Sequence, residues 1–201
     1  MKLSIHETIR GKPTKDAPVN LGYGWMNIEA TWPEVFELIT VDGVATSAEL
    51  NSDNRREANF VSRELLMVDI DEGMTIPELF DNEFYNLYGA GFYVTPSHTH
   101  ERPRFRIMFR LEQPETDSAR LRKINRGLLH IFAAGDDACK DPTRIFYGTP
   151  NCEIKEQREQ RLTTDFADIL IQVTNTLDAD MLERMEQASN VRSEEHTSEL
   201  Q

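Results

Sequence analysis

Short apolar runs separated by turn residues dominate the chain and predict strands alternating with helices. Residues 65–68 are four apolar residues in a row, bounded by Glu64 on one side and by Glu72 and Gly73 on the other. A run this short is typical of a buried strand, which we expect over 64–71. Further strands are expected at 92–95, at 104–111, where basic and apolar residues alternate, and at 144–148.

Two capping-box patterns predict where helices begin. Thr31-Trp32-Pro33-Glu34 and Thr75-Ile76-Pro77-Glu78 each place an N-cap threonine three residues before a glutamate, with proline in the first turn. They predict helices over 32–40 and from 75 to about 88. The periodicity predicts further helices over 115–134 and over 164–189, the latter in two pieces, and 1–24 is expected to be irregular. This order predicts an α/β or α+β domain whose mixed central sheet is covered by helices.

Composition narrows the class of protein. The chain has 201 residues, 39% of them hydrophobic, and a net charge of −13. It contains no apolar stretch near the roughly 20 residues that a membrane span needs, and Met1 is not followed by an apolar signal region. We therefore expect a cytoplasmic protein with no membrane contact. The two cysteines, Cys139 and Cys152, do not form a zinc pattern, so no zinc is expected.

The last ten residues form a separate segment. Residues 192–201 resemble the in-frame translation of a sequencing-library adapter, and we treat them as an artefact outside fold reasoning. On this interpretation the natural sequence is cut near Val191. Residues 156–191 would then be the truncated start of a helical C-terminal extension.

Two aspartates follow the predicted strand at 64–71. Because side chains alternate along a strand, Asp69 and Asp71 point to the same face. Neighbouring carboxylates repel each other unless a positive charge lies between them, and a divalent cation commonly supplies it. A solvated strand end explains the pattern equally well when it is taken alone.

Two later segments carry complementary groups. Ser97 and His98 follow the strand at 92–95. Arg104 and Arg106 share one face of the next strand, and a pair of guanidinium groups on one face is suited to binding phosphate oxygens. Residues 136–151 combine acids with Arg144. Each pattern also has an ordinary explanation. His98 can be an exposed surface histidine, the two arginines a solvated strand face, and residues 136–151 a polar turn.

In this order the motifs resemble those of the archaeo-eukaryotic primase superfamily, especially the primase-polymerases of phages, plasmids and other mobile elements. Asp69-Ile70-Asp71 is similar to the first, metal-binding motif, and Pro96-Ser97-His98 to the second motif, whose histidine contacts the nucleotide phosphates. Residues 136–151 are similar to the third motif region. The resemblance covers about residues 30–155. It implies a catalytic domain over 1–155 with a core like that of an RNA-recognition motif.

The resemblance also implies an activity and a set of roles. It implies a DNA primase or DNA polymerase that transfers nucleotides from (d)NTPs to a 3′-hydroxyl on a single-stranded DNA template, in replication of a mobile element. Two Mg²⁺ or Mn²⁺ ions would be held by Asp69, Asp71 and Asp136, with Asp141 as second choice for the third ligand and Asp137 also open. The phosphates would be bound by Ser97, His98, Arg104, Arg106 and Arg144. A helicase domain or subunit is a further partner of larger members.

Two other functions remain open on the sequence. His98-Thr99-His100 is a possible metal pair of a rolling-circle replication nickase, with Tyr85 or Tyr88 as nucleophile. The third possibility is a non-catalytic replication-initiator domain that binds DNA. In each case the basic stretch with Arg120, Arg122, Lys123 and Arg126 is a candidate for contact with the DNA backbone.

Overall fold

A computed structural model describes residues 1–14 and 20–198, with side chains described as far as residue 181. Its strands form two antiparallel sheets. The smaller has the order β2-β1-β3 and the larger β4-β5-β7-β6-β8. The strands are β1 (Lys2–Arg10), β2 (Trp25–Glu29), β3 (Val44–Ser47), β4 (Glu49–Leu50), β5 (Phe60–Ile70), β6 (Gly89–Val94), β7 (Phe105–Glu115) and β8 (Lys155–Gln157).

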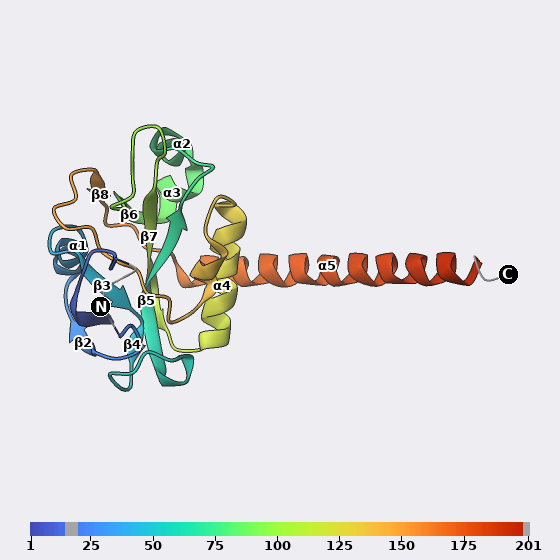
Figure 1. Cartoon of the computed structure of the whole chain (residues 1–201), viewed down its shortest axis with the longest axis horizontal. Helices are drawn as coiled ribbons and strands as arrows, with labels where there is room; N and C mark the ends of the chain where they lie inside the picture. Colours follow the sequence, from blue (N-terminus) through green and yellow to red (C-terminus); the bar gives the residue numbers. More distant parts are fainter. Residues whose placement is uncertain (15–19, 199–201) are drawn as a thin grey trace.

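Helices lie around these sheets and confirm the expected α+β class. They are α1 (Trp32–Thr40), α2 (Ile76–Asp81), α3 (Glu83–Tyr88), α4 (Ser118–Ile131) and α5 (Thr164–Ser198), with short 3₁₀ turns η1 (Glu57–Asn59) and η2 (Asp137–Lys140). Figure 1 shows α4 beside the larger sheet and α5 leaving the body of the molecule as one long rod. Within the part of the chain that the structure describes, no helix is apolar enough over sufficient length to cross a membrane.

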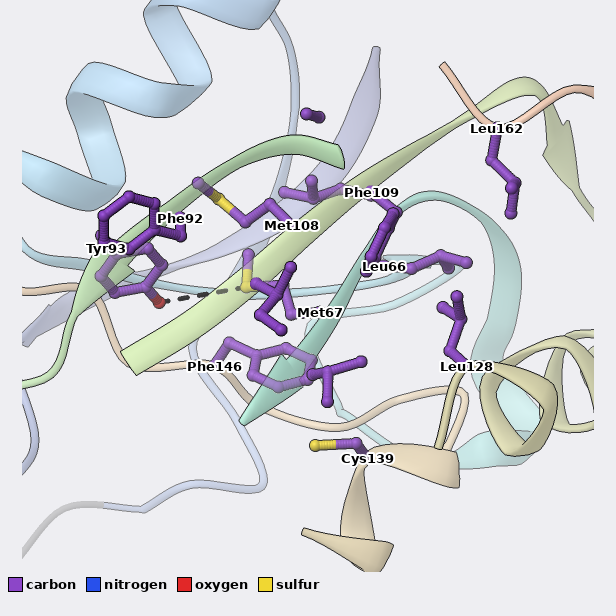
Figure 2. Packing of buried hydrophobic residues seen from close by; sticks show 14 of the residues in the cluster. Leu66, Met67, Phe92, Tyr93, Met108, Phe109, Leu128, Cys139, Phe146 and Leu162 are labelled. Atoms are coloured by element: carbon purple, nitrogen blue, oxygen red, sulfur yellow. Dashed lines mark hydrogen bonds between the residues drawn. The ribbon is translucent and has the colours of Figure 1, made fainter. Parts of the chain in front are cut away.

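The larger sheet contains the core expected from the sequence. Along the chain, the core elements follow in the order β5, α2–α3, β6, β7 and α4. After α4 the chain returns beside β5, where Gly135 forms an antiparallel bridge with Ile70. This is the strand and helix order of an RNA-recognition-motif core. One apolar face of the sheet packs on α4, and Figure 2 shows Leu66, Phe109 and Leu128 together in this layer. On the other face Met67 lies against Tyr93, whose hydroxyl is 3.9 Å from the Met67 sulfur.

The helix predicted at 32–40 is confirmed by α1, and the one predicted from 75 begins as expected. The capping glutamates accept hydrogen bonds of 2.7 Å from the backbone N–H groups of Thr31 and Thr75. The second helix is interrupted at Asn82, whose side-chain oxygen accepts a 2.9 Å hydrogen bond from the backbone of Tyr85. Because Asn82 caps a new helix, 75–88 contains two short helices, α2 and α3, in place of one.

The expectation that residues 1–24 are irregular is wrong for the first ten. Residues 2–10 form β1, the central strand of the smaller sheet, with Leu3 and Ile9 buried. β1 pairs with β2 on one side and β3 on the other. These partners are distant in sequence, and polar Ser4 and His6 are buried along with the apolar residues. Simple alternation therefore did not reveal the strand.

The strand predicted at 144–148 is also absent. Phe146 forms an isolated bridge with Thr46, and the neighbouring carbonyl of Tyr147 accepts hydrogen bonds from the side chains of Arg106 and Tyr93. Side chains thus occupy the acceptor that a strand neighbour would use. The segment joins the two sheets, because Phe146 bridges to β3 of the smaller sheet and the Tyr147 carbonyl accepts from Arg106 on β7 and Tyr93 on β6 of the larger sheet. Just after it, backbone N–H groups of Thr149 and Cys152 donate to carbonyls of Ile39 and Thr40 of α1 at 2.9 and 2.7 Å.

The C-terminal boundary expected at 155/156 cuts through the larger sheet. β8 (Lys155–Gln157) pairs with β6, so the sheet extends past residue 155 and the helical part begins at Thr164. α5 is one continuous helix, whereas two pieces were expected over 164–189. The segment 192–201, interpreted as an adapter, lies outside the residues whose side chains are described.

α5 is fixed to α4 at a close contact over Gly127. A Cβ at this position would lie 2.7 Å from the Leu170 Cβ and 2.9 Å from its carbonyl oxygen. Alanine normally stabilises a helix interior by about 1 kcal/mol relative to glycine. Here we expect Gly127→Ala to lower the free energy of unfolding by about 1–3 kcal/mol through overpacking. Urea denaturation measures this, with His130→Ala at an exposed position of α4 as control. A stabilising Gly127→Ala would contradict the contact.

Candidate functional site

Three buried side chains form a row across the centre of the larger sheet. Asp69 on β5 is directly opposite Arg106 on β7, which is directly opposite Tyr93 on β6. Arg106 donates from Nε and Nη2 to the two Asp69 carboxylate oxygens, both at 3.1 Å, and from Nη1 to the Tyr93 hydroxyl at 3.1 Å. Tyr93 in turn donates to the carbonyl of Tyr147 at 3.1 Å. The row therefore joins three strands to the loop between the sheets.

Burial governs the ionisation of these groups. Burial raises the pKa of Tyr93, which stays neutral. Burial by itself would lower the pKa of Arg106, but the Asp69 carboxylate and the hydrogen bond to the Tyr93 hydroxyl outweigh it and hold that pKa above its ordinary value. The bidentate Asp69–Arg106 pair is thus a buried ion pair with its hydrogen bonds made. All three guanidinium nitrogens of Arg106 donate hydrogen bonds within the protein, two of them to Asp69, while its side chain also lines the cleft.

Asp136 reaches Asp69 through the return of the chain beside β5. The Gly135–Ile70 bridge places the backbone N–H of Asp136 2.9 Å from the carbonyl oxygen of Asp69, to which it donates. The Asp136 side chain caps η2, accepting from the Ala138 N–H at 3.0 Å, and its other oxygen accepts from Arg144 at 2.8 Å. The return of the chain beside β5 therefore explains why Asp136, the expected third acid, lies near the end of that strand.

The remaining expected acids differ in position. Asp71 lies just past the end of β5, with 53% of its side chain exposed and Arg104 at 3.5 Å. Asp141 lines the same cleft, and its carboxylate accepts from the N–H and hydroxyl of Thr143 at 2.9 and 3.1 Å. Asp137 is exposed and pairs with Lys140, away from this cleft. The structure therefore leaves Asp136 and Asp141 as the candidates.

The cleft between the two sheets has a volume of about 390 Å³ and gathers nearly all of the expected site residues. Four aspartates and five cations line it together with Ser97 and Thr95. The charged residues are Asp69, Asp71, Asp136, Asp141, Lys12, Arg55, Arg104, Arg106 and Arg144. Acids and cations in one cleft suit a ligand that carries phosphates together with metal ions.

His98 is the expected site residue that does not line the cleft. It closes a turn in which its N–H donates to the carbonyl of Thr95 at 3.0 Å, directly after the lining residue Ser97. Its Nδ1 accepts a 3.1 Å hydrogen bond from the backbone of Arg104. In the neutral ring the proton is therefore assigned to Nε2, which can donate to an anion. This arrangement fits a phosphate contact better than metal ligation.

Sequence reasoning missed the wall of the cleft that two connections contribute. Lys12 and Leu21 come from the β1–β2 connection of the smaller sheet, and Arg55 comes from the β4–β5 connection of the larger sheet. The two connections are in contact, because the backbone N–H of Arg55 donates to the carbonyl of Gly22 at 2.8 Å. These residues lie in segments expected to be irregular or left unassigned, and no short motif marks them, so only the fold brings them into the cleft with the aspartates.

The positive charge beside each paired aspartate comes from the protein itself. Asp69, Asp71 and Asp136 pair with Arg106, Arg104 and Arg144, respectively. Among the described residues no three acidic, histidine or cysteine side chains are gathered as a ready metal site. The donors are nevertheless carboxylate oxygens in one cleft, the ligands that Mg²⁺ and Mn²⁺ prefer, so the residues fit such ions in kind.

The groups required by the nickase alternative are poorly placed. Tyr85 is fully buried, and burial together with its 2.9 Å hydrogen bond to Glu156 raises its pKa. Tyr88 packs on Phe84 and Phe166. Neither tyrosine lines the cleft, and His98 already uses Nδ1 on the backbone.

The basic face of α4 is largely neutralised within the molecule. Arg120 pairs with Glu115 and Asp168, Arg122 with Glu57, and Arg126 with Asp178. Two of these partners, Asp168 and Asp178, are on α5. Arg120 and Arg126 therefore attach α5 to the domain, and the internal pairing of all three arginines weakens the expectation that they track a DNA backbone.

Together the fold and the cleft define an α+β domain with an acidic and cationic site between two sheets. No family model matches the sequence, and no curated protein does. Among solved structures, the chain is similar to the primase-polymerase AEP domain of cyanophage S-2L. The two share 12% sequence identity with a TM-score of 0.45, over 86% of this chain and 87% of that chain. The likeness is at most one of general fold.

Substitution of the buried aspartate is predicted to lower stability far more than substitution of the exposed one. Asp69→Ala leaves Arg106 buried without its carboxylate, and we expect it to lower the free energy of unfolding by about 3–5 kcal/mol. Asp71→Ala removes an exposed pair and should cost less than about 1 kcal/mol. Urea denaturation of both variants gives the comparison. Equal losses would show that the Asp69–Arg106 pair does not hold the sheet as described.

Proposed function

We propose that this chain is the catalytic domain of a template-dependent nucleotidyltransferase, a DNA primase or DNA polymerase that uses (d)NTPs on single-stranded DNA in the cytoplasm. The carrying observation is the convergence of the three motifs in one cleft. Asp69 and Asp71 from β5, Ser97 after β6, Arg104 before β7 and Asp136 after α4 line a single cavity. These segments are far apart in sequence, and a chance set of surface acids and arginines would be scattered over several faces.

The chemistry of the cleft supports the transfer of a nucleotidyl group. Asp69, Asp71 and Asp136, or Asp141 in the third place, would hold two Mg²⁺ or Mn²⁺ ions. Such ions supply charge neutralisation to the phosphates and lower the pKa of an attacking hydroxyl. Arg104 and Arg144, at the cleft surface, would bind phosphate oxygens when their aspartates bind the ions. Arg106 keeps Asp69 oriented throughout, because its donors remain on Asp69 and Tyr93.

His98 and Ser97 complete the proposed nucleotide contacts. The Nε2 proton assigned to His98 and the hydroxyl of Ser97 are both donors at the same turn. Donors at this position would bind the anionic tail of the nucleotide. The substrate would therefore be held by donors from β6, the start of β7 and the loop that carries Arg144.

A non-catalytic DNA-binding domain is the second candidate. The observation that favours it is the pairing of three aspartates with arginines inside the protein. Pairs of this kind also occur where they serve the fold alone, and the buried Asp69–Arg106 pair joins two strands of the sheet. A binding role alone does not explain why the exposed carboxylate of Asp71 lies in the cleft.

Asp71 separates the two candidates because its loss should leave the fold intact. On a primed single-stranded template with dNTPs and Mn²⁺, we expect Asp71→Asn to reduce nucleotide incorporation by at least about 100-fold, since a metal ligand is lost at the reacting phosphates. Gel analysis of primer extension measures the rate. The same assay without primer tests for priming.

The matched control is Glu72→Gln. Glu72 is the next residue, is exposed, and pairs with Arg102 outside the cleft. Its incorporation rate should stay within about twofold of the wild type, as for other surface positions. Full activity in Asp71→Asn would refute the metal role. A wild-type protein that binds single-stranded DNA but incorporates no nucleotide would support the second candidate.

A further inference from the structure

The cleft has two walls with different charge balance. The wall formed by the larger sheet and its loops carries the aspartates together with Arg104, Arg106 and Arg144. The wall formed by the β1–β2 and β4–β5 connections carries Lys12, Leu21 and Arg55 and contributes no acid to the cleft. An anion that binds at this wall therefore meets two cations and no carboxylate from the same connections.

Arg55 differs from the other arginines of the cleft in its partners. Arg104, Arg106 and Arg144 each pair with an aspartate, whereas Arg55 forms no ion pair within the described part of the chain. Its Nη1 donates to the carbonyl of Thr143 at 3.0 Å, which fixes the guanidinium at the mouth of the loop that carries Arg144. The charge of Arg55 is thus anchored but not neutralised.

The guanidinium of Arg55 also has a donor without a partner. Its Nε is buried and makes no hydrogen bond among the described residues, and the same is true of the Nε of Arg104 on the facing wall. A buried donor left without an acceptor is costly and rare in proteins. Nε and Nη2 lie on one edge of a guanidinium, the edge that pairs with two oxygens of a phosphate.

We propose that Arg55 binds the polyphosphate tail of the nucleotide substrate from the wall formed by the β1–β2 and β4–β5 connections, with Lys12 as a second cation of the same wall. This inference rests on the proposed function and adds a second set of phosphate contacts to those of the motif residues. A cavity of about 390 Å³ is in the range of enclosed small-molecule sites, roughly 300–1,000 Å³. Its four aspartates disfavour a long polyanion, so a nucleotide fits the cleft better than a DNA backbone.

An apolar patch shared by the two walls supports this orientation. Leu21, Ile145 and Tyr147 line the cleft beside Arg55 and pack on the small core of Trp25 and Leu50. An apolar surface next to a cation suits a ligand with a sugar or base beside its phosphates. The cleft thus offers both kinds of contact that a nucleotide needs.

The test measures binding of inorganic tripolyphosphate to the full chain by calorimetry, in EDTA and without template. We expect Arg55→Gln to weaken binding about tenfold, the usual effect of losing a charge-assisted pair. Arg56→Gln is the matched control, because Arg56 is adjacent and exposed and does not line the cleft. It should change the affinity less than twofold. Lys12→Gln, on a different connection, should weaken binding in the same direction as Arg55→Gln.

Arg55→Lys is a second variant in case Arg55→Gln does not fold. Lysine keeps the positive charge but lacks the planar guanidinium group that pairs with two phosphate oxygens. If Arg55→Gln unfolds, a several-fold loss in the folded Arg55→Lys variant supports the proposal, and wild-type affinity overturns it. Equal affinity of Arg55→Gln and Arg56→Gln, or no binding by the wild type, also overturns it. An effect of Arg55→Gln on single-stranded DNA binding alone would assign Arg55 to nucleic acid and overturn the nucleotide assignment. Since the assay needs neither metal nor catalysis, its outcome is separate from that of primer extension.

Discussion

The buried ion pair between Asp69 and Arg106 is the interaction on which the rest of the site depends. It crosses from β5 to β7, and Arg106 continues the row to Tyr93 on β6 and to the carbonyl of Tyr147. A charge in the middle of a sheet is tolerated only when its hydrogen bonds are made, and here all of them are made to other structural elements. Removing either partner would leave the other buried and unpaired. The same pair therefore stabilises the sheet and holds a carboxylate at the edge of the cleft.

The second constraint is the loop that joins the two sheets. Residues 141–152 bridge to β3, hydrogen bond to the end of α1 and contact β6 through Thr149. They also carry Asp141, Arg144, Ile145 and Tyr147 into the cleft. Because the loop is fixed to both sheets, the wall that carries the aspartates and the wall that carries Lys12 and Arg55 are held in one arrangement. A ligand with both metal and phosphate groups would contact the two walls at once.

Much of this site was predictable from local sequence, and the reasons are specific. Capping boxes at Thr31 and Thr75 and the apolar run before Asp69 are local signals, so α1, the start of α2, and β5 were found. The shared face of Asp69 and Asp71 followed from strand periodicity. Asp136 was placed by motif order, and the Gly135–Ile70 bridge supplies its structural cause.

The features that the sequence did not predict depend on contacts between residues that are distant in sequence. β1 is defined by pairing with β2 and β3, and Arg55 becomes a cleft residue only when the two sheets meet. The segment 144–148 has strand-like composition, yet its Tyr147 carbonyl is taken by side chains. Three of the aspartates pair with arginines, and each arginine is either far from its aspartate in sequence or reached through the fold of the loop after α4. Sequence periodicity does not record any of these pairings.

The most direct measurement is a crystal structure of the full chain soaked with Mn²⁺ and a non-hydrolysable nucleoside triphosphate. The proposed function predicts anomalous density for Mn²⁺ at the Asp69 and Asp71 carboxylates and at Asp136, or Asp141 in its place, with the triphosphate in the same cleft and Arg104 and Arg144 turned toward its phosphates. Asp69 would remain paired with Arg106. Nucleotide density outside the cleft, or Asp71–Arg104 and Asp136–Arg144 pairs left unchanged with no Mn²⁺ at either aspartate, would contradict the account.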